Sequence, residues 1–473
     1  MQELLAEAAG ALCQRLAMPA GVTVATLARD QVEVLLPREA PRRGGGAQSL
    51  RRLLFDEFLP YVRDYRHPLH LGHQRPAPSF ASLYADFAAA AFNPSVTMFE
   101  GGPHAVAVEG RVLAWMKALA GYSDSAVATL VNGGAEANLT ALMVARDFAR
   151  AQGAAPQRWR VLAGEHAHYS IPRALHVLGL PADALVRIPS GDDLAMDMSA
   201  LRATAAALHD AGDRVIAIVA AAGCTANAAF DDLVAVRAVA AAHDAWFHVD
   251  AAHGGAALLS DRLQPLVAGL AAADSCVVDP HKMLFVSAPC SVLLCRRRAP
   301  FAASLGVGLA DADYVLPDPK ALVMESDGDE PLRWTLACTR FFSAFRLYAA
   351  ISAYGLDGLA ARIERCCALA RHLHDLLGAQ EDFDCLVPPA FNMACFRYRP
   401  PGVGPERLDA LNRALRQRLA AGPEAYLTGC SARGRYWLRA QIMSEHVNED
   451  SLDCLPDILR RTAAARPSLL NAV

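Results

Sequence analysis

Short apolar segments that alternate with helix-like segments constrain the fold of this chain more than any other feature of its sequence. Such segments occur at 127–134, 160–164, 214–223, 246–252, 275–280 and 291–297. Helix-like stretches such as 135–150 and 231–245 separate them. Strands that are apolar along their whole length are typical of a parallel or mixed sheet that helices cover on both faces. The sequence therefore predicts a large α/β domain.

The two ends of the chain have different patterns. Residues 1–75 resemble helices interrupted by a basic, glycine-rich stretch (37–49), which is typical of a surface linker. From about residue 380, strand-like segments such as MACFRYRP and YWLRAQIM alternate with helix-like ones, as in a smaller α+β domain. We therefore expect an N-terminal helical segment (1–80), a large α/β domain (81–335) and a small C-terminal α+β domain (336–473).

The composition excludes several classes of protein. Of the 473 residues, 53% are apolar and 20% are charged, which favours a buried globular interior over disorder. A net charge of −4 provides no electrostatic footprint for nucleic acid. No apolar stretch reaches about eighteen residues without a charge or a helix breaker, so we expect no membrane span.

Cysteine usage and the N-terminal residues bear on the cellular compartment. The N-terminus lacks the basic region and long apolar region of a signal peptide. The 12 cysteines include no C-x-x-C pair, which is typical of reduced thiols rather than of a disulfide framework or a zinc site. We therefore expect a cytoplasmic location.

Lys282, in the stretch VDPHKMLF, is one of three lysines among 45 basic residues. Lysine can lose its proton and attack a carbonyl, whereas a guanidinium effectively cannot. Asp250 also follows an apolar segment, where a carboxylate must be paired or hydrogen-bonded. One strand–helix–strand unit would separate the two residues, so they can lie on neighbouring strand ends, where open α/β sheets bind ligands. The alternative for Asp250 is a structural ion pair.

Two further segments follow predicted strands. In NGGAEANL (132–139), Gly133 and Gly134 allow a tight turn, and the next helix would direct free N–H groups at an anion such as a phosphate. An ordinary turn and helix cap is the alternative. EHAHYS (165–170) places His168 at another strand end, and the spacing of the histidines provides no H-x-x-x-H metal pair. We expect no metal site.

An anion-binding helix start, a buried aspartate, an imidazole and a single lysine together describe a pyridoxal phosphate (PLP) site. GGAEANLTALMVAR, EHAHYS, FHVDAAHGG, ADSCVVDPHKM and LRAQIM also occur in the order and approximate spacing of one known family. From about residue 67 to residue 460 the chain resembles the group II PLP-dependent amino-acid decarboxylases, which include the glutamate, cysteine-sulfinate, diaminobutyrate and aromatic amino-acid decarboxylases. The resemblance implies a PLP fold-type I homodimer, like aspartate aminotransferase, with shared active sites and an N-terminal dimerisation segment.

The resemblance also implies roles for individual residues. Lys282 corresponds to the lysine that carries PLP, Asp250 to the partner of the pyridine nitrogen, and His168 to the imidazole stacked on the ring. Ala252 would pack against the other ring face. Further cofactor contacts, chiefly around the phosphate, fall at Gly134, Ala135, Thr225, Asp279 and His281.

The implied reaction is the α-decarboxylation of an L-amino acid to an amine and CO2. In the loop that supplies a catalytic tyrosine in many relatives, the only tyrosine is Tyr314. His73, Gln74 and Thr97 lie where aromatic-specific relatives tend to have aromatic residues, which favours a polar substrate side chain, acidic or diamino. Arg439 could bind a substrate carboxylate or form a structural ion pair. The alternatives are an aldehyde synthase, an aromatic amino-acid decarboxylase and, more remotely, a non-catalytic scaffold.

Overall fold

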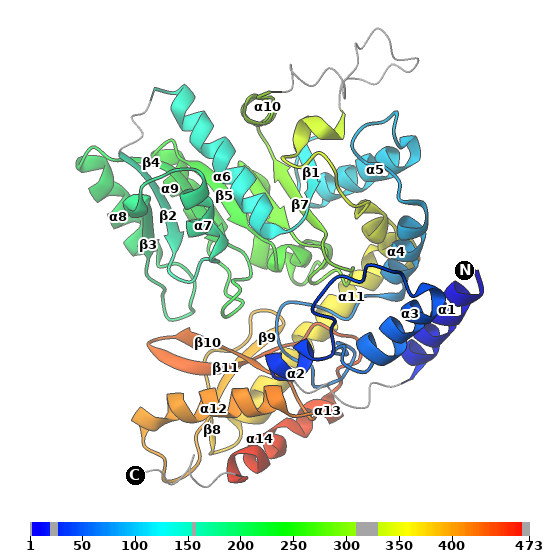
Figure 1. Cartoon of the computed structure of the whole chain (residues 1–473). Helices are drawn as coiled ribbons and strands as arrows, with labels where there is room; N and C mark the ends of the chain where they lie inside the picture. Colours follow the sequence, from blue (N-terminus) through cyan, green and yellow to red (C-terminus); the bar gives the residue numbers. More distant parts are fainter. Residues whose placement is uncertain (1, 19–26, 154–157, 309–329, 466–473) are drawn as a thin grey trace. The chain divides into compact units, whose positions relative to one another are not determined.

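The computed structural model describes residues 2–18, 27–153, 158–308 and 330–465 (Figure 1). The chain forms two compact units. One, the sheet unit, comprises Pro78–Cys367 and Ala390–Asn392. The other, the terminal unit, comprises Met1–Ala77, Ala368–Pro389 and Met393–Val473. The domain boundaries that the sequence indicated, at residues 80 and 335, stay a prediction.

A seven-stranded sheet forms the centre of the sheet unit, with the strand order β1-β7-β6-β5-β4-β2-β3. Only β7 runs antiparallel to its neighbours, so the sheet is mostly parallel, as predicted. The strand β3, which is short and carries the exposed Arg187 at the sheet edge, was not predicted, because it lacks a continuous apolar run. The strands are β1 (Val127–Val131), β2 (Trp159–Gly164), β3 (Leu185–Ile188), β4 (Arg214–Ala221), β5 (Trp246–Asp250), β6 (Ser275–Val278) and β7 (Ser291–Cys295).

Helices cover both faces of this sheet (Figure 1). The chain crosses the sheet in one direction through α6 and α7 and returns through α8 and α9, so right-handed connections place the two pairs on opposite faces. The helices of the unit are α4 (Phe80–Phe92), α5 (Pro103–Leu119), α6 (Gly134–Ala151), α7 (Ser170–Val177), α8 (Met198–Asp210), α9 (Leu233–Ala242) and α10 (Arg298–Leu305), with the 3-10 helices η3 (Ala182–Ala184) and η8 (Pro331–Trp334).

The connection between β5 and β6 differs from the predicted strand–helix–strand unit. It contains no α-helix but the 3-10 helices η4 (Gly254–Leu259), η5 (Gln264–Val267) and η6 (Leu270–Ala272). Pro265 interrupts the backbone hydrogen bonds of a helix, and Gly269 adopts a φ of 94°. The two strands are nevertheless neighbours in the sheet, so their carboxyl ends lie side by side.

The terminal unit contains a four-stranded antiparallel sheet with the order β10-β11-β9-β8. Its strands are β8 (Phe383–Cys385), β9 (Met393–Tyr398), β10 (Thr428–Ala432) and β11 (Arg435–Gln441). The sequence predicted β9 and β11, whereas β8 is too short and β10 too rich in small residues to be recognised. Its helices are α1 (Gln2–Ala17), α2 (Arg29–Glu33), α3 (Gly46–Arg52), the π-helix η1 (Leu53–Phe58), η9 (Pro405–Arg407), α12 (Leu408–Ala421), α13 (Glu449–Asp453) and α14 (Leu455–Ala464).

The long helix α11 (Ala344–Gly378) contributes residues to both units and is interrupted at Gly355, whose φ is 67°. A left-handed backbone conformation of this kind favours glycine. Within the described residues, no helix combines the length and the apolar character that crossing a bilayer requires.

A buried carboxylate connects strands β5, β6 and β7 at the end of the sheet opposite the predicted site. Asp274 is fully buried and accepts a hydrogen bond from the Phe247 N–H at 3.0 Å. It forms ion pairs with Arg296 at 2.7 Å, Arg297 at 2.8 Å and Arg237 at 3.5 Å. Removing one member of a buried ion cluster leaves the others without compensation.

We expect Asp274→Ala to lower the free energy of unfolding by about 3 kcal/mol, because three guanidinium groups and the Phe247 N–H lose their acceptor. The matched control is Asp384→Ala, which removes a more exposed pair with Arg399 and should change stability by less than about 1 kcal/mol. Urea unfolding curves compare the two variants. Equal effects of the two substitutions would contradict this account of Asp274.

Candidate active site

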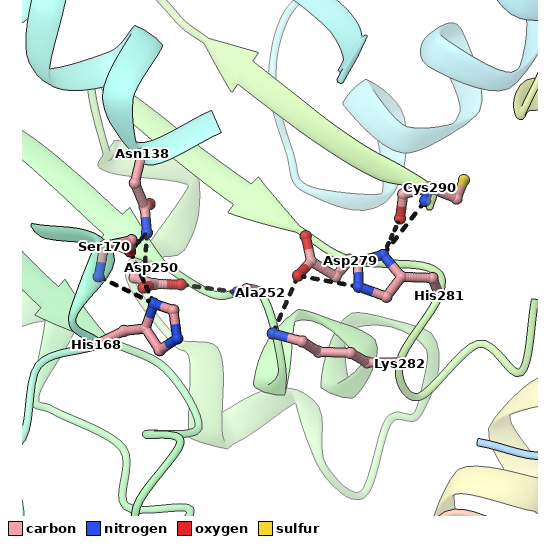
Figure 2. Close-up of polar contacts among 9 residues, drawn as sticks. All are labelled: Asn138, His168, Ser170, Asp250, Ala252, Asp279, His281, Lys282 and Cys290. Atoms are coloured by element: carbon pink, nitrogen blue, oxygen red, sulfur yellow. Dashed lines mark hydrogen bonds and ion pairs between the residues drawn. The ribbon is translucent and has the colours of Figure 1, made fainter. Parts of the chain in front are cut away.

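The predicted cofactor residues of the sheet unit lie at the carboxyl ends of its strands (Figure 2). Asp250 ends β5, and Asp279 and Lys282 follow β6. Gly134 starts α6 just after β1, and His168 lies between β2 and α7. Because the parallel strands end at one edge of the sheet, residues far apart in the sequence become neighbours there.

Lys282 forms an ion pair with Asp279. The distance from Lys282 Nζ to Asp279 Oδ2 is 3.0 Å, and the Asp279 side chain is 2% exposed. The Asp279 N–H donates to the Ala252 carbonyl at 3.1 Å, which connects the end of β6 to the segment after β5. The other carboxylate oxygen, Asp279 Oδ1, is buried without a hydrogen-bond partner. This carboxylate therefore retains capacity for a further donor.

His281 is adjacent to this pair. Its Nε2 lies 3.7 Å from Asp279 Oδ2, and its Nδ1 donates to the Cys290 carbonyl at 2.6 Å (Figure 2). The second bond fixes the ring against β7. His281 is therefore held beside the same carboxylate that pairs with Lys282.

Asp250 is surrounded by hydrogen-bond donors. Asn138 Nδ2 donates to Asp250 Oδ2 at 3.0 Å, and the Ala252 N–H donates to Oδ1 at 3.2 Å (Figure 2). Donors on both oxygens stabilise the ionised form of a carboxylate. Asp250 thus presents a negative charge at the sheet edge without an ion pair to Lys282.

His168 is held as a neutral ring. Its Nδ1 lies 2.8 Å from Ser170 Oγ, and Asn138 Nδ2 donates to the same Oγ at 2.9 Å. Burial lowers the pKa of His168, and Lys282 lowers it further, while Asp250 opposes both. At neutral pH the imidazole therefore offers an uncharged, flat face.

The start of α6 provides an anion-binding space. The first turn of a helix leaves N–H groups without partners inside the helix, here from Gly134 and Ala135 onward. A Cβ atom on Gly134 would lie 2.9 Å from Asp279 Oδ2 and 3.4 Å from the Ala252 methyl group. Glycine therefore keeps open a space that a side chain would fill.

This set of residues fits PLP. The helix start suits a phosphate, Asp250 suits a protonated ring nitrogen, and the Lys282 amine suits an aldehyde. Thr225 lies half-buried in the turn that follows the carboxyl end of β4. Within the described ranges, no group of three or more His, Cys, Asp or Glu residues could hold a metal ion.

The predicted substrate residues divide between the units. In the terminal unit, His73 Nε2 lies 2.9 Å from the Tyr426 hydroxyl, and Gln74 follows His73 in the chain. Arg439 lies on β11, where its Nε donates to Thr428 Oγ1 at 3.1 Å. Burial lowers the pKa of His73, and the charge of Arg439 lowers it further.

Thr97 belongs to the sheet unit, where its hydroxyl donates to the Cys338 carbonyl at 3.0 Å. Tyr314 lies outside the described residues. Sequence reasoning missed three residues, Asn138, Ser170 and Tyr426. Asn138 could have been suspected, since an amide on the buried face of an amphipathic helix needs polar partners.

Comparisons with known proteins show the family of the chain. The pyridoxal-dependent decarboxylase conserved domain matches residues 30–399. The L-2,4-diaminobutyrate decarboxylase of Rhizobium meliloti (strain 1021) is 32% identical over 426 residues, which are 89% of this chain and 83% of the relative. The acidic amino acid decarboxylase GADL1 of Homo sapiens is 28% identical over 443 residues, which are 90% of this chain and 84% of that protein.

The fold also matches solved structures. The crystal structure of Oryza sativa TDC with PLP and tryptamine has a TM-score of 0.88 at 24% identity, covering 98% of this chain and 97% of that chain. The predicted fold-type I architecture is thereby confirmed. The chain belongs to the pyridoxal-dependent decarboxylase family and is a PLP-dependent carboxy-lyase that acts on an amino acid.

Proposed function

We propose that this enzyme removes the α-carboxylate of an L-amino acid with a polar side chain, acidic or diamino, and that Lys282 carries its PLP. The observation that supports these roles is the arrangement of two carboxylates at neighbouring strand ends. Asp279 pairs with Lys282 at 3.0 Å, whereas Asp250 receives only neutral N–H donors and keeps its charge for another partner.

The residues of the site would have different roles in this reaction. Bound PLP supplies a ring that accepts the electron pair left when CO2 departs. Asp250 would hold a positive charge on the ring nitrogen, and His168 and Ala252 would hold the ring between them. Asp279 keeps the Lys282 amine oriented and can balance its charge when that amine holds a proton.

The phosphate contacts fall to residues that the sequence also indicated. The helix start at Gly134 and Ala135 would donate N–H groups, and Thr225 and His281 would add a hydroxyl and an imidazole. Tyr314 is proposed to return the proton to the substrate Cα. Without such a donor, oxidation to an aldehyde would compete with release of the amine.

The polar substrate class rests on His73 and its surroundings. Arg439, Arg416 and Arg63 all lower the pKa of this histidine, so it lies in a region of positive charge. Positive charge favours an anionic substrate group, so within the polar class this observation supports an acidic side chain rather than a cationic diamino one. The names of the diaminobutyrate decarboxylase and acidic amino acid decarboxylase relatives also indicate polar side chains.

Offered a panel of acidic, diamino and aromatic L-amino acids, the purified enzyme should convert a polar one to amine and CO2 in equal amounts. Aromatic amino acids should react at least about a hundredfold less efficiently, because their rings would leave buried polar groups unpaired. His73→Phe should reduce this preference at least about tenfold. The control His372→Phe, in the same unit but paired with Asp453, should not.

Preference for an aromatic substrate would contradict the polar assignment. Peroxide and ammonia formed in place of the amine would identify an aldehyde synthase instead. Carbon dioxide, amine, ammonia and peroxide are therefore measured in the same reactions.

Lys282→Arg should abolish both cofactor attachment and CO2 release. The arginine keeps a positive charge opposite Asp279, but it cannot bond covalently to the cofactor aldehyde. Visible absorbance and mass spectrometry after borohydride reduction report the attachment. The control is Lys117→Arg, since Lys117 Nζ only donates to the carbonyls of Asp124 and Ala126; this variant should retain the cofactor. Cofactor fixed by borohydride in Lys282→Arg would refute the role of Lys282.

We further propose that the enzyme is a homodimer with shared active sites. In this dimer, the region of Thr97 of one subunit would contribute to the active site of the other subunit. Phe80, Tyr84 and Phe87 form an aromatic face of α4 in the sheet unit, with exposures of 75%, 66% and 70%. In the terminal unit, no residue of α1 is buried. Contiguous apolar surfaces of this kind are typical of an interface with another chain.

Phe87→Glu should shift the enzyme from dimer to monomer, because a carboxylate would have to be buried at the interface. Light scattering coupled to size-exclusion chromatography measures the mass. The matched control is Val234→Glu on α9, where a single valine is 60% exposed. If both variants stay dimeric at micromolar concentration, α4 does not form the interface.

A cytoplasmic location is also proposed. The 12 cysteines all lie within the described residues, and the structure records no disulfide among them. Free thiols are typical of a reducing compartment.

A further inference from the structure

A hydrogen-bonded series of buried polar side chains, here called a chain, extends through the core of the sheet unit to the cofactor site. Its members come from two strands, two helices and the loop that carries His168, and most have no place in the proposed chemistry. Five of them are at most 2% exposed. In order from the core, the chain comprises Trp246, Ser275, His248, Asn138, Ser170 and His168, with Asp250 as a branch at Asn138.

The hydrogen bonds between these side chains run in one direction. Trp246 Nε1 can only donate, and it donates to Ser275 Oγ at 2.8 Å. The Ser275 hydroxyl hydrogen is then free to point at His248 Nδ1, also at 2.8 Å. The Asn138 amide decides the tautomer of this ring, because its Nδ2 faces Asp250 Oδ2, which can only accept, and its Oδ1 therefore faces His248 Nε2. His248 thus carries its proton on Nε2, and its Nδ1 accepts from Ser275. The Nε2 proton is donated to Asn138 Oδ1 at 2.9 Å.

The Asn138 amide is oriented with its nitrogen towards the site. Its two hydrogens go to Asp250 Oδ2 at 3.0 Å and to Ser170 Oγ at 2.9 Å (Figure 2). The carboxylate requires this orientation, because an ionised Asp250 can only accept. The bond from Trp246 to Ser275 is compatible with the arrangement that Asp250 requires.

The last link sets the tautomer of His168. Ser170 Oγ accepts from Asn138 and directs its own hydrogen to His168 Nδ1 at 2.8 Å. The Ser170 backbone N–H also points at this nitrogen, at 3.3 Å. Two donors on Nδ1 leave the ring proton on Nε2. The charged groups around His168 are Asp250, Lys282, Asp279 and Arg173.

We propose that Asn138 is a positioning residue for the cofactor: one amide holds Asp250 as a carboxylate and, through Ser170, holds His168 as the neutral Nε2–H tautomer. The Trp246–Ser275–His248 segment keeps this amide in the orientation that does both. The inference rests on the proposed cofactor roles of Asp250 and His168. Burial also lowers the pKa of His248 to about 4, which agrees with a neutral ring in the chain.

A purely structural network would have the same hydrogen bonds but no effect on the site. Buried polar groups must be satisfied wherever they occur. A positioning role makes a further demand, since loss of the Asn138 donors must change the affinity for PLP and the protonation of Asp250 and His168. These readouts separate the two possibilities.

Asn138→Leu tests the proposal in the full-length enzyme. Removing both donors should weaken PLP binding at least about tenfold, as expected for the loss of hydrogen bonds to a charged group. It should also move the acidic limb of the kcat/KM profile to higher pH. Ser170 becomes free to accept a hydrogen bond from protonated His168, which favours the charged ring and raises its pKa.

The matched control is Thr140→Val. Thr140 is equally buried on α6, but its hydroxyl donates only to the Glu136 carbonyl at 2.9 Å. This variant should leave PLP affinity and the pH profile unchanged. If Asn138→Leu changes thermal stability alone, as this control could, the positioning role is wrong.

Trp246→Phe keeps the ring and removes only the donor, so it serves if Asn138→Leu does not fold. It should move the acidic limb in the same direction by a smaller amount, and an unmoved limb would count against the proposal. Nitrogen NMR of isotope-labelled histidine, assigned with His168→Gln and His248→Gln, reports the tautomers directly. A proton on Nδ1 of either ring in the wild-type enzyme would overturn the direction of the chain, whether or not decarboxylation is observed.

Discussion

The negative charge of Asp250 at the end of β5 is the constraint on which the rest of the site depends. A carboxylate at this position must remain ionised beside a lysine without being neutralised by it. The structure achieves this with a second carboxylate, because Asp279 takes Lys282 as its partner at 3.0 Å. Asp250 receives neutral N–H groups instead, which stabilise its charge and leave its field available to a ligand.

The positions of these side chains depend on the register of the strands. In the pairing of β5 with β6, His248 lies opposite Ser275 and Asp250 opposite Val277. A slip by one residue would turn each of these side chains to the other face of the sheet. The register that forms the apolar core therefore also places His248 within reach of Ser275. The strand register thus determines both the apolar packing and the polar contacts in this part of the protein.

The predictable part of the protein is the part in which each residue carries its own signal. A lysine in an arginine-rich chain, an aspartate after an apolar strand and paired glycines before a helix all stand out in a single sequence. The unpredicted part consists of residues whose meaning depends on their neighbours. Asn138, His248 and Ser275 each lie within or beside an apolar run, and nothing local distinguishes them from isolated buried polar residues. The short strands β3, β8 and β10 were missed for the same reason, since their sheet partners define them.

The sequence by itself determined the alternation of strands and helices, the residue types at the strand ends and the resemblance that identifies PLP chemistry. Hydrophobic periodicity and side-chain chemistry are local properties, so they can be read without a fold. Only the tertiary structure decided which carboxylate pairs with Lys282, that 3-10 helices connect β5 to β6, and in which direction the hydrogen bonds behind His168 run. Each of these depends on distances of about 3 Å between groups far apart in the chain, and hydrogen-bond energy is lost beyond that range.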